Sequence, residues 1–300
     1  MKRKLLYLVN PISGAKNKHA LEETIRSRTA ARGLAYAIYP TVAGGDYDFA
    51  AGFIRDEGFT DVIIAGGDGT INQVLNSLRH TGVTFGIIPC GSGNGLAFSA
   101  GLPKNKDKAL DIIFEGASRS TDAFTINERF ACMLCGLGFD AQVAHDFAND
   151  ARRGLSTYIK KTISNFFSAP AYPFGLLVNG RRIETEAYFI SIANSNQFGN
   201  HFTIAPKASL TDGLLDIVIM TKQSKLSVLL QALRQVGGYN RLQEVDVLNE
   251  KAGVIYFQAE SLKVSNPFPA PMHIDGDPAE TAEAVNIRLL KDCFRLIYPS

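Results

Sequence analysis

Short apolar runs alternate with longer amphipathic segments from Leu5 up to Thr121. Each apolar run has the length of a buried strand, and each longer segment has the length and periodicity of a helix. The expected strands are Leu5 to Val9, Ala35 to Tyr39, Val62 to Ala65 and Phe85 to Ile88. The expected helices are Lys18 to Arg32, Tyr47 to Glu57, Ile71 to Leu78, and a further stretch after the fourth strand. This alternation predicts a parallel sheet covered by helices on both faces.

The pattern changes near Asp122 to runs of Val, Ile, Phe and Thr that are broken by turns. Asn179-Gly180 suits a two-residue hairpin turn. The strand-like segments are Thr121 to Asn127, Phe130 to Cys135, Ala187 to Asn194, Leu214 to Met220, Gly253 to Phe257 and Leu262 to Ser265. Helices are expected near residues 141–168 and 225–237. This part of the chain therefore predicts an antiparallel β domain.

The two patterns predict two domains, an α/β domain over residues 1–121 and a β-rich domain over residues 122–283. Two last strands, Ala284 to Leu290 and Phe294 to Tyr298, follow them. The sequence leaves open whether residues 284–300 return to complete the first domain. A length of 300 residues with 46% apolar residues suits two packed domains.

The charge is nearly balanced, with 31 Lys and Arg against 29 Asp and Glu and a net charge of +2. This balance excludes a strongly basic protein, and we expect no nucleic-acid partner. Four cysteines in 300 residues do not make a disulfide scaffold, and the N-terminal segment turns polar too soon for a signal peptide. No apolar run approaches the ~20 residues of a membrane-spanning helix. We therefore expect a cytoplasmic protein, and any membrane contact is expected to be peripheral, on the inner face.

The strongest candidate site follows the third expected strand, where Gly-Gly-Asp-Gly-Thr at Gly66 to Thr70 leads into a helix. Glycines let the backbone approach an anion closely, and the free N–H groups of a helix N-terminus carry a positive partial charge. Both features suit a phosphate. Asp68 would repel a phosphate unless a cation lies between them, so its position favours a magnesium-bound nucleotide or proton abstraction. The competing interpretation is a tight turn in which Asp68 caps the helix.

Two other loops follow expected strands. Pro89 to Gly95 follows the fourth strand and is rich in glycine, and Asn10 to Gly14 follows the first. Because the carboxyl ends of parallel strands lie at one edge of a sheet, we expect a single anion-binding edge. Asn10 and Ser13 can donate hydrogen bonds to a phosphate or a sugar. None of the three loops is a P-loop, because no Gly-Lys-Ser or Gly-Lys-Thr closes it.

Four motifs in one order carry a resemblance to a known family. They are Asn-Pro-x-Ser-Gly at Asn10 to Gly14, Gly-Gly-Asp-Gly-Thr-Ile-Asn at Gly66 to Asn72, Gly-Ser-Gly-Asn at Gly91 to Asn94, and Ile-Asp-Gly-Asp at Ile274 to Asp277. In this order they resemble the diacylglycerol kinase catalytic-domain family, which also contains sphingosine and ceramide kinases and soluble bacterial lipid kinases. The resemblance implies an NAD-kinase-like nucleotide-binding α/β domain over residues 1–121, followed by a lipid-binding β-sandwich. It also implies an enzyme that uses ATP and Mg²⁺ to phosphorylate a lipid at a membrane surface.

The resemblance further implies a set of nucleotide-binding residues, drawn from the three loops and from Thr41 after Pro40. The set comprises Asn10, Pro11, Ser13, Gly14, Thr41, Gly66, Gly67, Asp68, Gly69, Thr70, Ile71, Asn72, Gly91, Ser92 and Asn94.

A late carboxylate is the expected base. In the family, a carboxylate in an Asp-Gly-Glu motif is taken to deprotonate the lipid hydroxyl. This chain has Asp277 where Glu is usual, so its side chain is one methylene shorter. Either the lipid lies closer to Asp277, or a water intervenes, or Asp68 or Asp275 takes the proton. The competing interpretation of residues 275–277 is a polar turn.

A magnesium site away from the phosphates is also implied. Thr211-Asp212-Gly213 resembles the family's Asp-Gly segment, which holds a structural magnesium ion. The expected ligands are the Asp212 carboxylate and the backbone carbonyls of Ser209 and Leu214, with waters in the remaining positions. Taken alone, Thr-Asp-Gly before an apolar strand predicts a turn.

The identity of the lipid and two other functions stay open. The loop Gly-Ser-Gly-Asn-Gly departs from the Gly-Thr-x-Asn-Asp common in soluble bacterial members and looks more like the sphingosine and ceramide kinase branch. The acceptor is therefore diacylglycerol or a sphingoid or ceramide-type lipid. The alternatives are an NAD kinase, which shares the Gly-Gly-Asp-Gly-Thr loop, and a nucleotide- or lipid-binding protein with impaired catalysis, which Asp277 in place of Glu suggests.

One amphipathic segment is a candidate for membrane contact. Residues 152–167 place apolar side chains along one helical stripe and four cations elsewhere. This arrangement suits a membrane interface, and it also suits a surface helix packed on its own domain, which is the commoner case.

Overall fold

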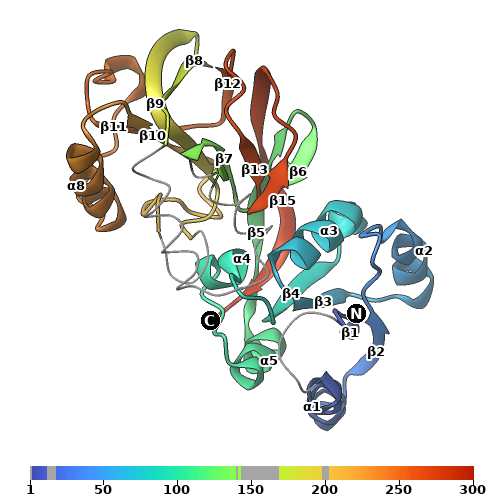
Figure 1. Cartoon of the computed structure of the whole chain (residues 1–300). Coiled ribbons are helices and arrows are strands. Elements are labelled where there is room, and N and C mark those ends of the chain that lie inside the picture. The colour runs from blue at the N-terminus through green and yellow to red at the C-terminus, as the bar shows by residue number, and fades with distance from the viewer. Residues whose placement is uncertain (1, 12–17, 140, 143–168, 198–202) are drawn as a thin grey trace. The chain divides into compact units, whose positions relative to one another are not determined.

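The computed structural model describes residues 2–11, 18–139, 141–142, 169–197 and 203–300 of the chain. The chain divides into two compact units (Figure 1). Unit 1 comprises Met1–Thr121 and Asp292–Ser300, and unit 2 comprises Asp122–Lys291. Two strands, β5 (Ala117–Ile126) and β15 (Ala284–Tyr298), have residues in both units. Residues 292–300 thus belong with the N-terminal part of the chain.

A parallel sheet forms the centre of unit 1, in the order β2, β1, β3, β4 and the end of β15. Its first four strands are β1 (Lys4–Val9), β2 (Ala35–Pro40), β3 (Asp61–Gly66) and β4 (Thr84–Pro89). β3 is buried along its whole length, as is expected for a parallel strand covered on both faces. The carboxyl ends of these strands lie at one edge of the sheet.

Helices cover both faces of this sheet (Figure 1). They are α1 (Lys18–Ala31), α2 (Asp48–Glu57), α3 (Asp68–Leu78) and α5 (Lys106–Glu115), with the short elements η1 (Arg79–Thr81) and α4 (Gly95–Ser99) between them. On one face, Ile25 of α1 and Ile113 of α5 join a buried cluster around Tyr7. α2 and α3 lie over the other face. The predicted α/β architecture is confirmed.

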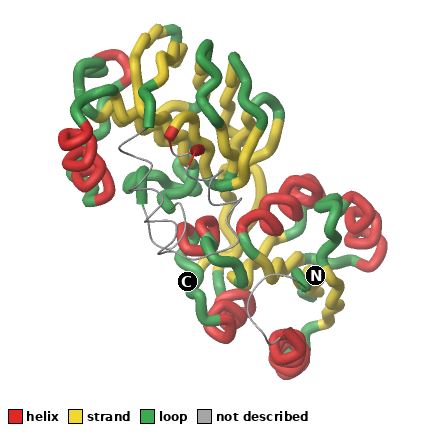
Figure 2. Tube along the Cα trace, in the orientation of Figure 1, coloured by secondary structure: helices red, strands yellow, loops and turns green. Residues whose placement is uncertain are grey.

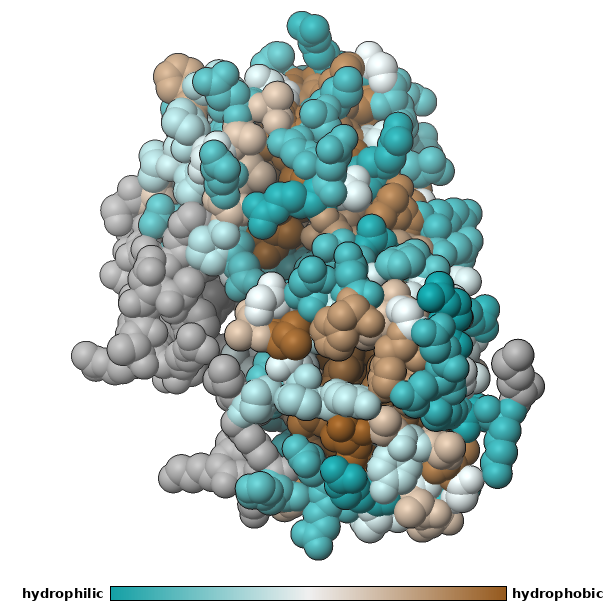
Figure 3. Space-filling view, turned by 90° about the vertical axis from the view of Figure 1, so that its right-hand side faces the viewer, coloured by the Kyte–Doolittle hydropathy of each residue, from teal (hydrophilic) through white to brown (hydrophobic). Residues whose placement is uncertain are grey.

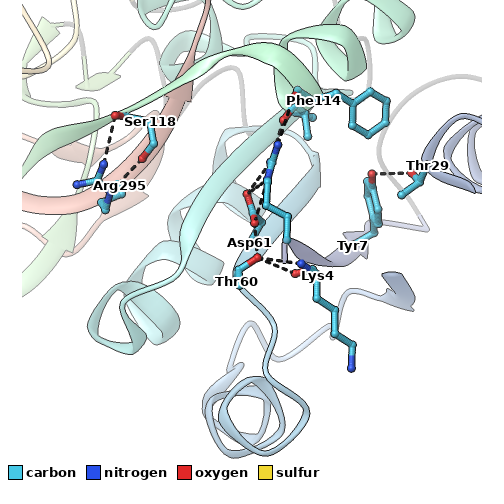
Figure 4. Close-up of polar contacts among 10 residues, drawn as sticks. Lys4, Tyr7, Thr29, Thr60, Asp61, Phe114, Ser118 and Arg295 are labelled. Atoms are coloured by element: carbon cyan, nitrogen blue, oxygen red, sulfur yellow. Dashed lines mark hydrogen bonds and ion pairs between the residues drawn. The ribbon is translucent and has the colours of Figure 1, made fainter. Parts of the chain in front are cut away.

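Polar contacts hold the edge of the sheet opposite the carboxyl ends (Figure 4). Arg3 donates to Asp61 at 2.6 Å and to the carbonyl oxygens of Ile113 at 2.9 Å and Phe114 at 3.1 Å. The buried Asp61 also accepts a hydrogen bond from the Thr60 hydroxyl at 2.6 Å. Because these charged groups are satisfied within the fold, we assign this edge a structural role.

Antiparallel strands form most of unit 2. With the second half of β5 they are β6 (Arg129–Ala131), β7 (Leu134–Gly138), β8 (Tyr172–Val178), β9 (Arg181–Ala193), β10 (Leu215–Thr221), β11 (Val254–Ala259), β12 (Ser261–Ser265), β13 (Met272–Ile274), β14 (Asp277–Ala279) and the first half of β15. The main order is β14, β13, β7, β9, β8, β12, β15, and β10 pairs with β9 and β11. Phe124, Ile190 and Phe257 lie in their shared core. The predicted antiparallel β domain is confirmed.

Two elements of unit 2 that short sequence patterns predict are present in the structure. Asn179 and Gly180 both have positive φ, and Val178 pairs with Arg181 across them, which is the predicted hairpin between β8 and β9. The expected helix near residues 225–237 is α8 (Lys225–Val236), and the short η2 (Val245–Val247) follows it.

Two predicted elements differ from the structure. Phe130 to Cys135 is not one strand, since the chain leaves β6 at Ala131 and starts β7 at Leu134. The carboxylate of Asp275 accepts hydrogen bonds from the backbone N–H groups of Cys132 and Met133. These two groups therefore cannot pair with a neighbouring strand. Conversely, β15 is continuous where two strands were expected, and it accommodates Asp292 at a positive φ.

Some predictions fall on residues outside the described ones. These are the contacts expected of Ser13 and Gly14, residues 143–168 of the helix expected near residues 141–168, and the membrane-contact candidate at residues 152–167. Among the helices of the described residues, none has the length and apolar character needed to cross a bilayer.

Candidate active site

The loop between β3 and α3 forms the centre of the site. Gly67 is the extended residue before the helix, and α3 begins at Asp68, three residues earlier than the periodicity predicts. The amide of Ile71 donates to the carbonyl of Gly67 at 3.0 Å, which closes the first turn. A Cβ on Gly66 would lie 2.8 Å from the Thr70 Cβ, so glycine is required there. The tight turn presents the N-terminal end of α3 at the strand end, where it can bind an anion.

The loop after β4 lies directly against this turn. The amide of Cys90 donates to the carbonyl of Gly66 at 2.8 Å, and a Cβ on Gly91 would lie 2.6 Å from the Cα of Gly67. Asn94 is buried in the left-handed conformation, and its side-chain amide exchanges two hydrogen bonds of 2.8 Å with the backbone of Gly91. Its side chain therefore shapes the loop, and the nucleotide contact expected of Asn94 stays a prediction.

The end of β1 and the end of β2 complete the same edge. Asn10 donates its side-chain amide to the Thr70 hydroxyl at 2.7 Å, and its backbone amide donates to the carbonyl of Ala65 at 2.9 Å. The amide of Thr41 donates to the carbonyl of Val9 at 3.0 Å. The four strand ends thus bring Asn10, Thr41, Gly66 to Thr70 and Gly91 together.

The remaining residues of unit 1 that were predicted to bind the nucleotide differ in their solvent exposure. Ser92 and Pro11 are exposed, and Asn72 is half-buried on α3. Ile71 is fully buried, with the apolar face of its helix, so only its backbone faces the loop region. We therefore assign its side chain to the core of unit 1 instead of to a ligand.

The late acids lie at the turn between β13 and β14 in unit 2. Asp275 and Gly276 both have positive φ, and Ile274 pairs with Asp277 across them. The Asp275 carboxylate accepts the backbone N–H groups of Cys132 at 2.9 Å, Met133 at 2.9 Å and Leu134 at 3.0 Å. These three hydrogen bonds tie the carboxylate to the backbone between β6 and β7. They give Asp275 a structural role, and its alternative role as the catalytic base stays a prediction.

Asp277 lies in a different environment. The residue lies at the surface, yet partial burial of its carboxyl group raises its pKa, the nearby Asp275 raises the pKa further, and His273 lowers it. His273 is fully buried, and its Nδ1 accepts the backbone N–H of Gly276 at 3.3 Å, which supports the turn. A carboxylate with a raised pKa is a stronger base than an ordinary aspartate.

The predicted metal segment contains carboxylates in close proximity. The Asp212 carboxylate accepts the N–H of Leu214 at 3.1 Å, and Gly213, at a positive φ, donates its N–H to Asp122 at 2.8 Å. Asp216 is fully buried and accepts hydrogen bonds from the Tyr256 hydroxyl and from Gln258 at 2.9 Å.

Burial and mutual repulsion perturb these groups. Burial, together with a smaller contribution from Asp212, raises the pKa of Asp216 to about 6, against the lowering effect of its two hydrogen bonds and of Lys207. Burial likewise raises the pKa of Asp212, and the Asp122 charge adds to the rise. Crowded oxygen donors of this kind suit a hard cation. Among the described residues, no three His, Cys, Asp or Glu side chains form a metal cage, so a cation here would rely on backbone carbonyls and waters.

Sequence reasoning missed two residues of this region, Asp122 and Asp216. A usable signal exists, because each is a single acid within an apolar strand, in Thr-Asp-Ala-Phe and Leu-Leu-Asp-Ile-Val. A charged residue at such a position is buried only with partners.

Comparisons with known proteins agree with this architecture. Residues 4–126 match the model of the diacylglycerol kinase catalytic domain, and residues 134–296 match that of the YegS C-terminal NAD kinase beta sandwich-like domain. The chain is 27% identical over 285 residues to a diacylglycerol kinase of Bacillus subtilis, covering 92% of this chain and 90% of the relative. It is 26% identical over 260 residues to a probable lipid kinase YegS-like protein of Chromohalobacter salexigens, covering 84% and 80%.

A solved structure shows the same fold. The crystal structure of a putative diacylglycerol kinase from Bacillus anthracis matches with a TM-score of 0.78 at 21% identity, covering 99% of this chain and 97% of that one. Together with the family models, this likeness confirms the α/β domain and the β-sandwich. Kinases of this family use ATP. The chain belongs to the diacylglycerol kinase catalytic-domain family with a YegS-type C-terminal domain, and it is a phosphotransferase of the lipid kinase class.

Proposed function

We propose that this enzyme transfers the γ-phosphoryl group of ATP to a hydroxyl of a membrane lipid, in a magnesium-dependent reaction on the cytoplasmic face, where ATP is present. The observation that carries the proposal is the backbone contact of the two glycine loops at the N-terminus of α3. Diacylglycerol is the first acceptor to test, since the Bacillus subtilis relative is named a diacylglycerol kinase. The Gly-Ser-Gly-Asn string of Gly91 to Asn94 keeps a sphingoid or ceramide-type lipid as the second.

The residues of unit 1 are proposed to hold the triphosphate. Gly67 and Gly91 let the backbone approach the phosphates without steric hindrance, and the first N–H groups of α3 donate to them. The Asn10 side chain donates a hydrogen bond to the Thr70 hydroxyl, and both side chains can contribute polar groups at the carboxyl ends of the strands. Ser13, Gly14, Thr41, Gly69, Asn72 and Ser92 are proposed to complete the nucleotide contacts.

Asp68 is proposed to hold the magnesium ion of the nucleotide. Its position in the first turn of α3 places a carboxylate among groups that bind anions, which fits a site shared by a phosphate and a cation. Bound magnesium would neutralise the charge that develops between the β and γ phosphates.

Asp277 is proposed as the base, and its raised pKa supports this role. The lipid oxygen attacks the γ phosphorus, the bond from that phosphorus to the ADP oxygen breaks, and the hydroxyl proton passes to the Asp277 carboxylate. The products are a lipid phosphate and ADP. The carboxylate of Asp212, with the carbonyls of Ser209 and Leu214, is proposed to hold a second, structural magnesium ion, a role supported by the raised pKa of Asp212.

A single experiment tests the proposed reaction. The purified protein receives radiolabelled ATP and magnesium with diacylglycerol, sphingosine, ceramide, phosphatidylglycerol or NAD in separate reactions. We expect label in one lipid and in none without magnesium. Label in NAD alone would instead establish an NAD kinase, and ATP binding without transfer to any acceptor would establish a protein with impaired catalysis.

A further inference from the structure

Helix α8 presents its apolar side to solvent. The exposed fractions are 70% for Leu226, 46% for Leu229, 57% for Leu230 and 64% for Leu233. These positions are spaced by three and four residues, so the four leucines form one stripe along the helix. Figures 1 and 2 show α8 at the periphery of unit 2. On the face drawn in Figure 3, by contrast, apolar residues are interspersed with hydrophilic ones.

The side of α8 that faces unit 2 is partly polar. Val228 and Gln235 are its buried residues, and the Gln235 amide donates to the carbonyl of Ile204 at 2.8 Å and accepts from Asn240 at 2.9 Å. At the other end, the Lys225 ammonium donates to the carbonyl of Ala169 at 2.8 Å, and the Ser224 hydroxyl caps the helix. These directional contacts fix the rotation of the helix, so the outward position of the leucines is set by the fold.

The charged residues of the segment that contains the stripe are all cations. From Lys222 to Gln243 the chain contains four cations and no Asp or Glu. Lys222 pairs with Glu186, and Lys225 is engaged as described, while Arg234 and Arg241 are exposed. Tyr239, 73% exposed, follows the helix directly. Leucines, an aromatic residue and arginines on one surface are the composition of a helix that lies in the interface of an anionic bilayer.

The small size of the apolar surface favours a bilayer over a protein as its partner. A helix of 12 residues is ~18 Å long. Its outer side alone is small against the ~800 Å² that each partner buries in a standard protein interface. Insertion into a bilayer has no such minimum, because a few apolar side chains and nearby cations act together.

We propose that α8 inserts Leu226, Leu229, Leu230 and Leu233 into the surface of an anionic bilayer and so docks the enzyme on the membrane that holds its substrate. This surface lies apart in the sequence from residues 152–167. The inference rests on the proposed function for its purpose, but the binding itself is measured without turnover.

The test is cosedimentation with vesicles of phosphatidylcholine, with and without phosphatidylglycerol. We expect the variant with Leu226→Gln, Leu230→Gln and Leu233→Gln to bind mixed vesicles about tenfold or more weakly, with an unchanged melting temperature because these side chains are already exposed. Arg234→Gln with Arg241→Gln should weaken binding to the mixed vesicles alone, and added salt should weaken the wild type. Phe268→Gln, which changes a residue 63% exposed elsewhere on unit 2, is the matched control and should bind normally.

Activity assays keep this inference separate from the proposed function. The leucine variant should phosphorylate lipid in detergent micelles at the wild-type rate and show a raised KM only on vesicles. Wild-type vesicle binding by the folded leucine variant would overturn the docking role of α8 even if lipid is phosphorylated. Equal loss in Phe268→Gln, or a wild-type dimer that the leucine variant dissociates, would also overturn it. Leucine-dependent vesicle binding by a protein that phosphorylates no lipid would support the docking role and refute the proposed reaction.

Discussion

Gly67 and Gly91 touch through their backbones, since a Cβ on Gly91 would lie 2.6 Å from the Cα of Gly67 and one on Gly67 would lie 3.0 Å from the Cα of Gly91. The two residues follow neighbouring strands, β3 and β4. Their contact makes one surface of two loops. The nearest atom to a Cβ on either glycine belongs to the backbone of the other, so movement of a side chain cannot relieve this contact.

Gly91→Ala should therefore separate the two loops. We expect a loss of about 1–3 kcal/mol in the free energy of unfolding and a weaker affinity for ATP. Chemical denaturation and titration calorimetry with ATP measure the two effects. Gly52→Ala is the matched control, because Gly52 lies within α2 with nothing closer than 3.9 Å, so alanine should stabilise the helix by up to about 1 kcal/mol. Normal ATP affinity in Gly91→Ala would show that the loop contact is irrelevant to the nucleotide.

Asp68→Asn should abolish most turnover and leave the fold intact. The change removes the charge that is proposed to hold magnesium, and we expect kcat to fall about a hundredfold or more. Steady-state kinetics and a melting curve are measured together. Asp56→Asn, an exposed aspartate on α2, makes the same chemical change in the same unit and should have normal kinetics. Wild-type turnover in folded Asp68→Asn would contradict the nucleotide-site assignment.

Asp277→Asn should impair catalysis, whereas Asp275→Asn should impair stability. Asp277→Asn should lower kcat with little change in ATP affinity or melting temperature, because the lost interaction belongs to the transition state. Asp275→Asn should cost about 3 kcal/mol of stability, since an amide has one accepting oxygen instead of two and cannot accept all three backbone N–H groups. A stable, inactive Asp275→Asn beside an active Asp277→Asn would move the base to Asp275.

The pH profile offers an independent check on Asp277. The base must be ionised to accept a proton, and its pKa is raised. The wild-type kcat should therefore rise with pH through a midpoint above the ordinary range of aspartate. A flat profile across that range would contradict the assignment.

Asp216 should make the protein less stable as the pH rises from about 4 to about 6. Its pKa is 3.8 in an ordinary setting and about 6 in the folded protein, so in this window the folded state binds more protons than the unfolded state. Each rise in pH then favours the unfolded state. Asp216→Asn should flatten this part of the curve, which denaturation at several pH values measures in the presence of a chelator.

Magnesium should reduce this pH dependence if it binds at the Asp212 segment. A cation beside the carboxylates favours their ionised forms and stabilises the folded state by mass action. Asp212→Asn should abolish the stabilisation by magnesium. Identical wild-type curves in chelator and in magnesium would exclude the proposed structural metal site.

The strand ends of unit 1 were predictable because their signals are local. A buried strand followed by glycines and a helix occupies a dozen neighbouring residues, and the parallel arrangement then brings such loops together. The role of Asp275 was not predictable, because its partners lie more than 140 residues away in the chain and include the backbone of Cys132. The three-residue strands β13 and β14 are likewise too short to show a period.

Periodicity located α8 but does not indicate which way its leucines face. A leucine stripe on a helix ordinarily packs against a core. Here hydrogen bonds of Gln235 hold the opposite side to unit 2, and no local pattern reports a bond to the carbonyl of Ile204. Segments whose apolar side is directed outward by polar anchors are therefore recognised only in the folded structure.

The pairing of β15 with β4 also determines when unit 1 can be completed during synthesis. Residues 292–300 leave the ribosome only after the whole of unit 2 has been translated. Until then β4 has no partner on that side, since Arg295 and Leu296 supply the pairing with Thr84 and Phe85. The nascent nucleotide-binding unit therefore carries an open, apolar sheet edge through most of translation, the kind of edge that associates with other chains. Its protection depends on a strand that is made after the whole of unit 2.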